Sequence, residues 1–242
     1  MKEGILITGA TSDIGYEFLK NFKDKNKVII AFYYDFEERL DDLVKNYGLN
    51  IIKIKYNFLE LNDLKIILEE NLKDIFVSKV LHLSAPTVKQ ERFNKIGMEQ
   101  YKIDFSIQVL SIIEILKIII PKMKKEKRGK IIFVLSSVTN GVPPKFWTSY
   151  ITSKYALEGL MKSLVAEYSS FGIQINGISP SMIKSKFLNT MDERLIEIEI
   201  EKHPMKRTIE IKEIIETIDY LFESKNQFLT GNNLLLTGGE NY

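Results

Sequence analysis

Short apolar runs alternate with longer helical patterns along the whole chain of 242 residues, and this alternation restricts its fold more than any other feature. Seven runs read as strands: Ile5–Thr8, Val28–Tyr33, Ile51–Tyr56, Val80–Ser84, Lys130–Leu135, Gln174–Ile178 and Asn233–Thr237. Most are almost entirely apolar, as expected of parallel strands that are covered on both faces. The sequence therefore predicts an α/β fold with a doubly wound parallel sheet of about seven strands.

The segments between these runs have helical patterns, and helices that alternate with parallel strands cover both faces of a sheet. Six are expected: Ile14–Lys23, Glu37–Asn46, Leu61–Asn71, Glu99–Lys127, Ser149–Ser170 and Ile211–Glu223. We find no internal repeat, low-complexity tract or Pro/Gly/Ser-rich linker. A single domain over residues 1–242 is expected, because one hydrophobic core can organise a chain of this length.

Composition narrows the functional classes. A net charge of +2 gives no general attraction to nucleic acid or membranes. The absence of cysteine excludes disulfides and thiol-based sites, and His82 and His203 have no partner at metal-ligand spacing, so no metal site is expected. The apolar stretch Ile103–Ile120 is interrupted by polar and charged residues, which argues against a transmembrane helix. A cytoplasmic protein is therefore expected.

The first predicted strand leads into a glycine-containing turn and then a helix, with Gly4–Gly15 reading GILITGATSDIG. Small residues here let the backbone approach a pyrophosphate, and the N–H groups of the helix start face the anion. We interpret the segment as a dinucleotide-binding loop rather than a plain turn. Its candidate cofactor-binding residues are Gly9, Thr11, Ser12, Asp13, Ile14 and Gly15.

The end of the second strand is where a dinucleotide site usually reads the adenosine ribose. An acid there favours NAD, and a nearby Arg or Lys favours NADP. Phe32, Tyr33, Tyr34 and Asp35 give neither signal clearly. The missing acid at Tyr33 tilts the prediction toward NADP without excluding NAD, and Tyr33 is a candidate ribose contact.

Tyr150 and Lys154 are four residues apart in a predicted helix, so both lie on one face. A neighbouring ammonium lowers the pKa of a phenol, and such a phenol acts as an acid or base toward a carbonyl or alcohol oxygen. Ser137 lies 13 residues before Tyr150, just beyond a strand, and its hydroxyl can hold the same oxygen. Tyr16 and Lys20 share the spacing but have Glu3 in place of that serine, so we interpret them as a surface pair.

Taken in order, these motifs resemble the short-chain dehydrogenase/reductase family over nearly the whole chain. Thr8-Gly9-x-x-x-Asp13-Ile14-Gly15 is similar to the family's phosphate loop, Ser137, Tyr150 and Lys154 to its catalytic residues, and Thr237-Gly238-Gly239 to its C-terminal signature. The resemblance implies a Rossmann-type sheet, NAD(P) as cofactor and a small carbonyl or alcohol substrate. It also implies that Tyr150, Lys154, Pro180, Ile183 and Ser185 contact the nicotinamide half. Asn57 would lie near the adenine, and Phe58, Ser84 and Ala85 are further candidate cofactor-binding residues.

Three departures from the family pattern bear on the chemistry. Asp13 replaces the middle glycine of the loop, Leu83-Ser84-Ala85-Pro86 replaces the family's NNAG segment, and Gln108 replaces an asparagine that supports the proton relay to the lysine. The second and third resemble members associated with bacterial surface-sugar biosynthesis, which implies an activated sugar as substrate. A 3-oxoacyl thioester reductase is the alternative, as is a non-catalytic NAD(P)-binding sensor or assembly protein.

Two segments suggest what surrounds the site. Residues 181–209 have the least regular pattern and read as a substrate lid, the alternative being a helical excursion whose solvated face is Glu193–Lys202. Val109–Ile120 is apolar on nearly all sides, and such a helix needs more cover than one sheet face supplies. A homodimer or homotetramer is expected, the alternative being a monomer that covers this helix itself.

Overall fold

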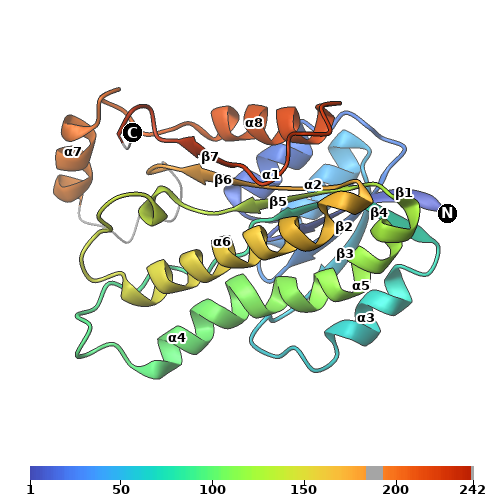
Figure 1. Ribbon diagram of the computed structural model, residues 1–242, viewed down its shortest axis with the longest axis horizontal. Coiled ribbons are helices and arrows are strands. Elements are labelled where there is room, and N and C mark those ends of the chain that lie inside the picture. Colours follow the sequence, from blue (N-terminus) through green and yellow to red (C-terminus); the bar gives the residue numbers. More distant parts are fainter. Residues whose placement is uncertain (184–192, 241–242) are drawn as a thin grey trace.

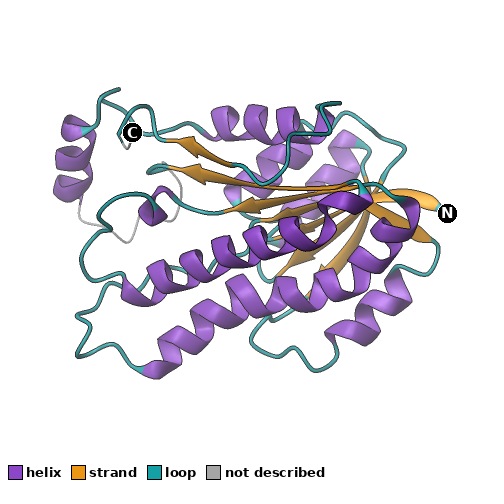
Figure 2. Ribbon diagram, in the orientation of Figure 1, coloured by secondary structure: helices purple, strands orange, loops and turns teal. Residues whose placement is uncertain are grey.

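The computed structural model describes residues 1–183 and 193–240, and at its centre is a parallel sheet of seven strands (Figure 2). The strand order is β3-β2-β1-β4-β5-β6-β7. The strands are β1 (Lys2–Thr8), β2 (Val28–Tyr33), β3 (Asn50–Lys55), β4 (Ile75–His82), β5 (Gly129–Val134), β6 (Ile173–Pro180) and β7 (Asn233–Leu236). The predicted doubly wound, Rossmann-type sheet is confirmed.

Helices cover both faces of the sheet (Figure 1). On one face lie α1 (Asp13–Lys20), α2 (Glu37–Tyr47) and α8 (Ile211–Glu223). On the other lie α3 (Leu64–Asn71), α5 (Ser111–Glu126) and α6 (Thr148–Tyr168), with α4 (Met98–Phe105) packed against α6. A further helix, α7 (Glu193–Lys202), stands apart from both layers.

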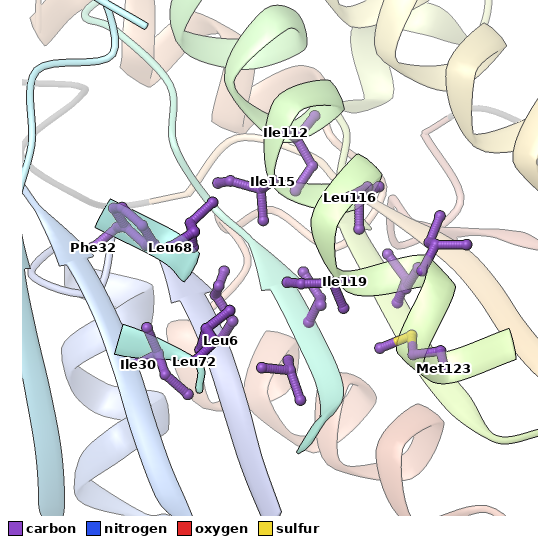
Figure 3. Close-up of a cluster of buried hydrophobic side chains, with 14 of the residues drawn as sticks. Leu6, Ile30, Phe32, Leu68, Leu72, Ile112, Ile115, Leu116, Ile119 and Met123 are labelled. Atoms are coloured by element: carbon purple, nitrogen blue, oxygen red, sulfur yellow. The ribbon is translucent and has the colours of Figure 1, made fainter. Parts of the chain in front are cut away.

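The larger core lies between the sheet and α3, α5 and α6. Figure 3 shows Ile112, Ile115 and Ile119 of α5 directed toward strand residues such as Leu6 and Ile30. Each is at most 2% exposed, and burying a side chain of this size contributes about 1.5–3 kcal/mol. Much of the apolar surface of α5 is therefore already covered within the chain.

The predicted helix Glu99–Lys127 is interrupted. Between α4 and α5 the backbone forms a π-helical turn, Ser106–Leu110, with Gln108 at its centre. A π turn shifts the register of the side chains around it and is frequent at functional sites. Sequence periodicity did not predict it, because the apolar pattern continues through the turn.

The carboxyl ends of all seven strands lie at one edge of the sheet, toward which the arrowheads in Figure 2 point. The chain order reverses between β1 and β4, and ligands of doubly wound sheets bind in the crevice at such a point. The candidate residues of the first, second, fourth and fifth strand ends meet at this edge. Within residues 1–183 and 193–240, no helix has both the length and the apolar character that a membrane crossing requires.

Candidate active site

The loop after β1 is shaped for close approach by a ligand. Gly9 has φ +65°, a conformation that favours glycine. A Cβ added to Gly15 would lie 2.6 Å from Gly9 O and 2.8 Å from Ala10 O, so only glycine lets α1 start this close to the strand. Ser12 Oγ accepts a hydrogen bond from Gly15 N at 3.1 Å and caps the helix. A pyrophosphate fits such a turn and helix start.

Arg39 of α2 closes one side of this loop. Its Nη1 donates hydrogen bonds to Thr11 O and Asp13 Oδ1, both at 2.9 Å, and its guanidinium packs on the ring of Tyr16. A cation thus stands beside the loop at the end of β2, where the ribose is read. Sequence reasoning missed it, because it searched Phe32–Asp35 at the strand end rather than the following helix.

Tyr33, the predicted ribose contact, is buried at the end of β2. Burial, and then a hydrogen bond with Glu37, raise the pKa of its phenol to about 12. Lys53 holds Glu37 in turn, with Nζ 2.8 Å from Oε1. Tyr33 is therefore engaged by its own neighbours, and Arg39 is the charged group that faces the loop.

The other candidate cofactor contacts follow β3 and β4, two strands that β2 and β1 separate in the sheet. Asn57 follows β3, and its Oδ1 accepts a hydrogen bond from Leu59 N at 3.1 Å. Phe58 is a core residue, with its ring 5.6 Å from that of Phe32. Ser84 is buried and donates its N–H to Thr8 Oγ1 at 3.3 Å, whereas Ala85 is exposed. The Thr8 hydroxyl thus ties the end of β1 to the loop after β4.

Tyr150 and Lys154 of α6 are both buried, at 8% and 3% exposure. Lys154 Nζ donates to Val134 O at 2.9 Å and lies 5.5 Å from the centroid of the Tyr150 ring. A hydrogen bond joins the Tyr150 phenol to the hydroxyl of Ser136. Ser137, the expected partner, starts the short 3-10 turn Ser137–Thr139 that follows. Two adjacent serines follow β5, and it is the first of them that bonds the phenol.

Burial dominates the electrostatics of this pair. It raises the pKa of Tyr150 to about 12, although the hydrogen bond from Ser136 acts to lower it. Burial also lowers the pKa of Lys154 to about 7, against the opposing effect of the Asp104 charge. This differs from the expectation that the ammonium lowers the phenol pKa, because both groups are shielded from water. The phenol therefore keeps its proton at neutral pH.

Gln108 lies in the π turn against α6, and its side chain is fully buried. Its Nε2 donates to Ser153 Oγ at 2.8 Å, while its backbone carbonyl accepts a hydrogen bond from His82 Nε2 at 2.9 Å. Since that carbonyl only accepts, His82 carries its proton on Nε2, and its Nδ1 accepts from Thr8 Oγ1 at 2.7 Å. Gln108 thus lies within the site and joins α6 to β4.

The predicted nicotinamide contacts lie at the end of β6. Pro180 is buried, and Ile183 forms a parallel bridge with Ile209. Ser185 lies outside the described residues, as do residues 184–192 of the predicted lid 181–209. In the described chain, no group of three or more His, Asp or Glu side chains is placed to hold a metal ion.

Comparisons with known proteins agree with this geometry. A model of the short-chain dehydrogenase/reductases, described as enoyl-(acyl carrier protein) reductase, matches residues 9–241. The 3-oxoacyl-[acyl-carrier-protein] reductase FabG of Staphylococcus epidermidis is 22% identical over 99% of each chain.

Solved structures share the fold. A gluconate 5-dehydrogenase from Beutenbergia cavernae, described as putative and NAD(P)-dependent and with NADP bound, superposes with a TM-score of 0.89 at 15% identity, over 98% of this chain and 96% of that one. ElxO with NADP bound gives a TM-score of 0.84 at 24% identity, over 99% and 98%. The chain belongs to the short-chain dehydrogenase/reductase family and is an NAD(P)-dependent oxidoreductase.

Proposed function

We propose that the protein reduces a ketone to an alcohol, with Tyr150 as the proton donor. The observation that carries the proposal is the buried phenol, which keeps its proton at neutral pH beside the Ser136 hydroxyl. When bound, the dinucleotide would supply the hydride for the carbonyl carbon. The Tyr150 O–H bond breaks and its proton goes to the carbonyl oxygen, so that an alcohol and a tyrosinate result.

The other residues of the site support this transfer. A hydroxyl that bonds the phenol is placed to hold the substrate oxygen in line with it, and we assign that role to Ser136, with Ser137 at the next position. Lys154, when charged, stabilises the tyrosinate electrostatically. Gly9, Gly15 and the start of α1 hold the pyrophosphate.

NADP is the proposed cofactor. The support is Arg39, whose guanidinium lies beside Thr11 and Asp13 at the ribose-reading end of β2. A guanidinium recognises phosphate through charge-assisted hydrogen bonds, which the 2′-hydroxyl of NAD does not match. The NADP reported in two structural neighbours agrees with this choice.

A 3-oxoacyl thioester is the proposed substrate class. The side chains that pack around Tyr150 are mainly apolar: Val88, Val138, Trp147 and Ile151. Such walls suit an acyl chain next to the reacting ketone. The name of the S. epidermidis relative points to the same class. A keto-sugar, expected from the Leu83–Pro86 and Gln108 resemblance, forms the second arm of a substrate screen.

The proposed assembly is a homodimer or homotetramer in the cytoplasm, where NADPH is kept reduced. A groove between α5 and α6 supports self-association, because most of its lining is apolar, including Ile113, Leu116, Leu160 and Leu164. The groove lies between these two helices, and one of its lining residues, Leu116, is also part of the core drawn in Figure 3.

The deciding experiment compares Tyr150→Phe with the wild type. NADPH oxidation would be followed with 3-oxoacyl thioesters and keto-sugars, and NADPH binding by nicotinamide fluorescence. We expect turnover to fall at least a hundredfold while NADPH affinity changes less than threefold, because only the proton donor is removed. Tyr155→Phe is the matched control, since Tyr155 is half-exposed on the same helix. Equal turnover in wild type and Tyr150→Phe would contradict the proposal and favour a non-catalytic binding protein.

A further inference from the structure

Asp104 of α4 is a buried carboxylate for which the proposed reaction has no role. It is 1% exposed, and a buried charge is costly unless something compensates it. Its Oδ1 accepts a hydrogen bond from Gln100 Nε2 at 3.2 Å. Its Oδ2 has no hydrogen-bond partner in the described part of the chain, and the same is true of the buried Ser149 Oγ and Gln108 Oε1. A buried carboxylate oxygen without a partner is rare and calls for an explanation.

The packing of α4 against α6 places this carboxylate beside the site. Tyr101 Oη and Thr148 Oγ1 are 3.2 Å apart, which joins the helices one turn before Asp104. Gln108 Nε2 and Ser153 Oγ are 2.8 Å apart, which joins them one turn after it. Asp104 is thus held against the turn of α6 that carries Ser149, Tyr150 and Lys154. Burial raises the pKa of its carboxyl, whereas the Ser149 hydroxyl, the Gln100 amide and the Lys154 charge lower it.

Few charges face Lys154 from the elements around it. From β5 it meets the carbonyl of Val134, and from α6 the uncharged phenol of Tyr150. From β4 it faces His82, whose pKa burial lowers to about 3, so that this imidazole is neutral. From α4 it faces Asp104, the one group among the described residues whose charge favours the ammonium form of Lys154.

We propose that Asp104 is a positioning residue of the active site, whose buried carboxylate is the counter-ion that favours the ammonium form of Lys154 while α4, α6 and β5 shield the lysine from water. This inference rests on the proposed function only for the role of Lys154. Without the carboxylate, burial alone acts on the lysine, which then loses its proton rather than remain an isolated buried charge. A neutral Lys154 no longer stabilises a tyrosinate.

The carboxylate acts on Tyr150 in two opposed ways. Its negative charge raises the phenol pKa directly. Through Lys154 it acts in the other direction, because a charged lysine favours the tyrosinate. Removing the charge of Asp104 without changing its shape therefore shifts the pKa of the Tyr150 phenol. A lower pKa indicates the direct effect, and a higher pKa indicates the effect through Lys154. If Asp104 served only in packing, its substitution would not move the pH profile of the reaction to higher pH.

The test is the pH profile of alcohol oxidation by Asp104→Asn, with Glu99→Gln as the matched control on the exposed face of the same helix. We expect the Asp104→Asn profile to move to higher pH by about one unit, with at least a tenfold loss of turnover at pH 7, and the Glu99→Gln profile to stay in place. A profile that stays in place or moves to lower pH in Asp104→Asn overturns the inference.

A second measurement keeps the inference separable from the proposed function, because it needs neither substrate nor cofactor. The free energy of unfolding would be measured at pH 7 for the wild type, Asp104→Asn, Lys154→Met and the double variant. If the two charges are partners, the double variant is less destabilised than the sum of the single variants. If the effects of the two substitutions on the free energy of unfolding are additive, the inference is overturned, even where turnover is found. If the effects are coupled but no turnover is found, only the proposed function is contradicted.

Discussion

At the scale of single residues, Arg39 is the basis of the proposed preference for NADP. Its guanidinium is fixed by Thr11 O and Asp13 Oδ1 and by packing on Tyr16, so little side-chain freedom remains to be lost when a phosphate binds. Asp13, which stands where the family has glycine, orients the cation toward the loop. Asp13, which departs from the family pattern, and Arg39 of α2 therefore act together.

We predict that Arg39→Ala weakens NADPH binding at least tenfold and NADH binding less than threefold. A hydrogen bond to a charged group contributes about 1.5–3 kcal/mol, and only the 2′-phosphate of NADPH gains it. Fluorescence titration with both cofactors measures the two dissociation constants. Lys45→Ala, at an exposed position of the same helix, is the control. An equal loss for both cofactors would mean that Arg39 only shapes the loop.

At the scale of elements, His82 connects three segments. It lies at the end of β4, accepts a hydrogen bond from Thr8 of β1, and donates one to the carbonyl of Gln108 in the π turn. Burial lowers its pKa from the usual 6.5 to about 3. The neutral ring therefore holds the π turn, and with it Gln108, against the sheet.

A pH dependence of stability follows from this depressed pKa. Below pH 6.5 the unfolded chain binds a proton at His82, while the folded chain does not until about pH 3. The stability from this group is thus complete above pH 6.5 and is lost as the pH falls, by about 1.4 kcal/mol per unit. Between pH 7.5 and pH 5, the free energy of unfolding measured with urea should fall by about 2 kcal/mol less in His82→Gln than in the wild type.

His203→Gln serves as the comparison, because it removes a second buried histidine whose Nε2 lies 3.0 Å from Thr237 O, far from the π turn. An unchanged pH slope in His82→Gln would show that the imidazole takes up its proton as readily in the folded chain as in the unfolded one.

For the whole molecule, the open question is what covers the groove between α5 and α6. Its apolar lining is flanked by Lys117 and Lys124, so the groove has an apolar centre and charged edges, as protein interfaces do. The inward face of α5 is filled by the chain's own core. Self-association, if it uses this surface, depends on the outer faces of α5 and α6 together rather than on Val109–Ile120 alone.

We predict that the wild type sediments as a dimer or tetramer of its 28.1 kDa chain and that Leu164→Arg sediments as a monomer with an unchanged circular dichroism spectrum. A guanidinium at the centre of an apolar interface is left without a partner, which disfavours association. Tyr220→Arg, at an exposed site on α8, should leave the mass unchanged. A wild type that sediments as a monomer would contradict the predicted assembly.

Local chemistry determined most of the architecture. Apolar runs bounded by turn residues predicted the seven strands, and their alternation with helices predicted a parallel sheet. Strands and helices can be told apart in the sequence because their side chains repeat with periods of two and 3.6 residues. Tyr150 and Lys154 were placed on one face by helix geometry, and Gly9 and Gly15 by the needs of a tight turn. The boundaries of some strands differ from those predicted. Strand β4 begins at Ile75 rather than Val80, because its first residues pair with Lys2–Gly4.

Tertiary structure alone decided how the site is completed. The hydrogen bond between Ser136 and the Tyr150 phenol, and the π turn that holds Gln108, are features that spacing along the chain does not specify. Arg39 reaches the loop after β1, and Asp104 lies against α6, only because separate helices pack together. Spacing along a chain specifies which residues share a face of one element. Packing determines which faces meet and which charged groups are shielded from water there.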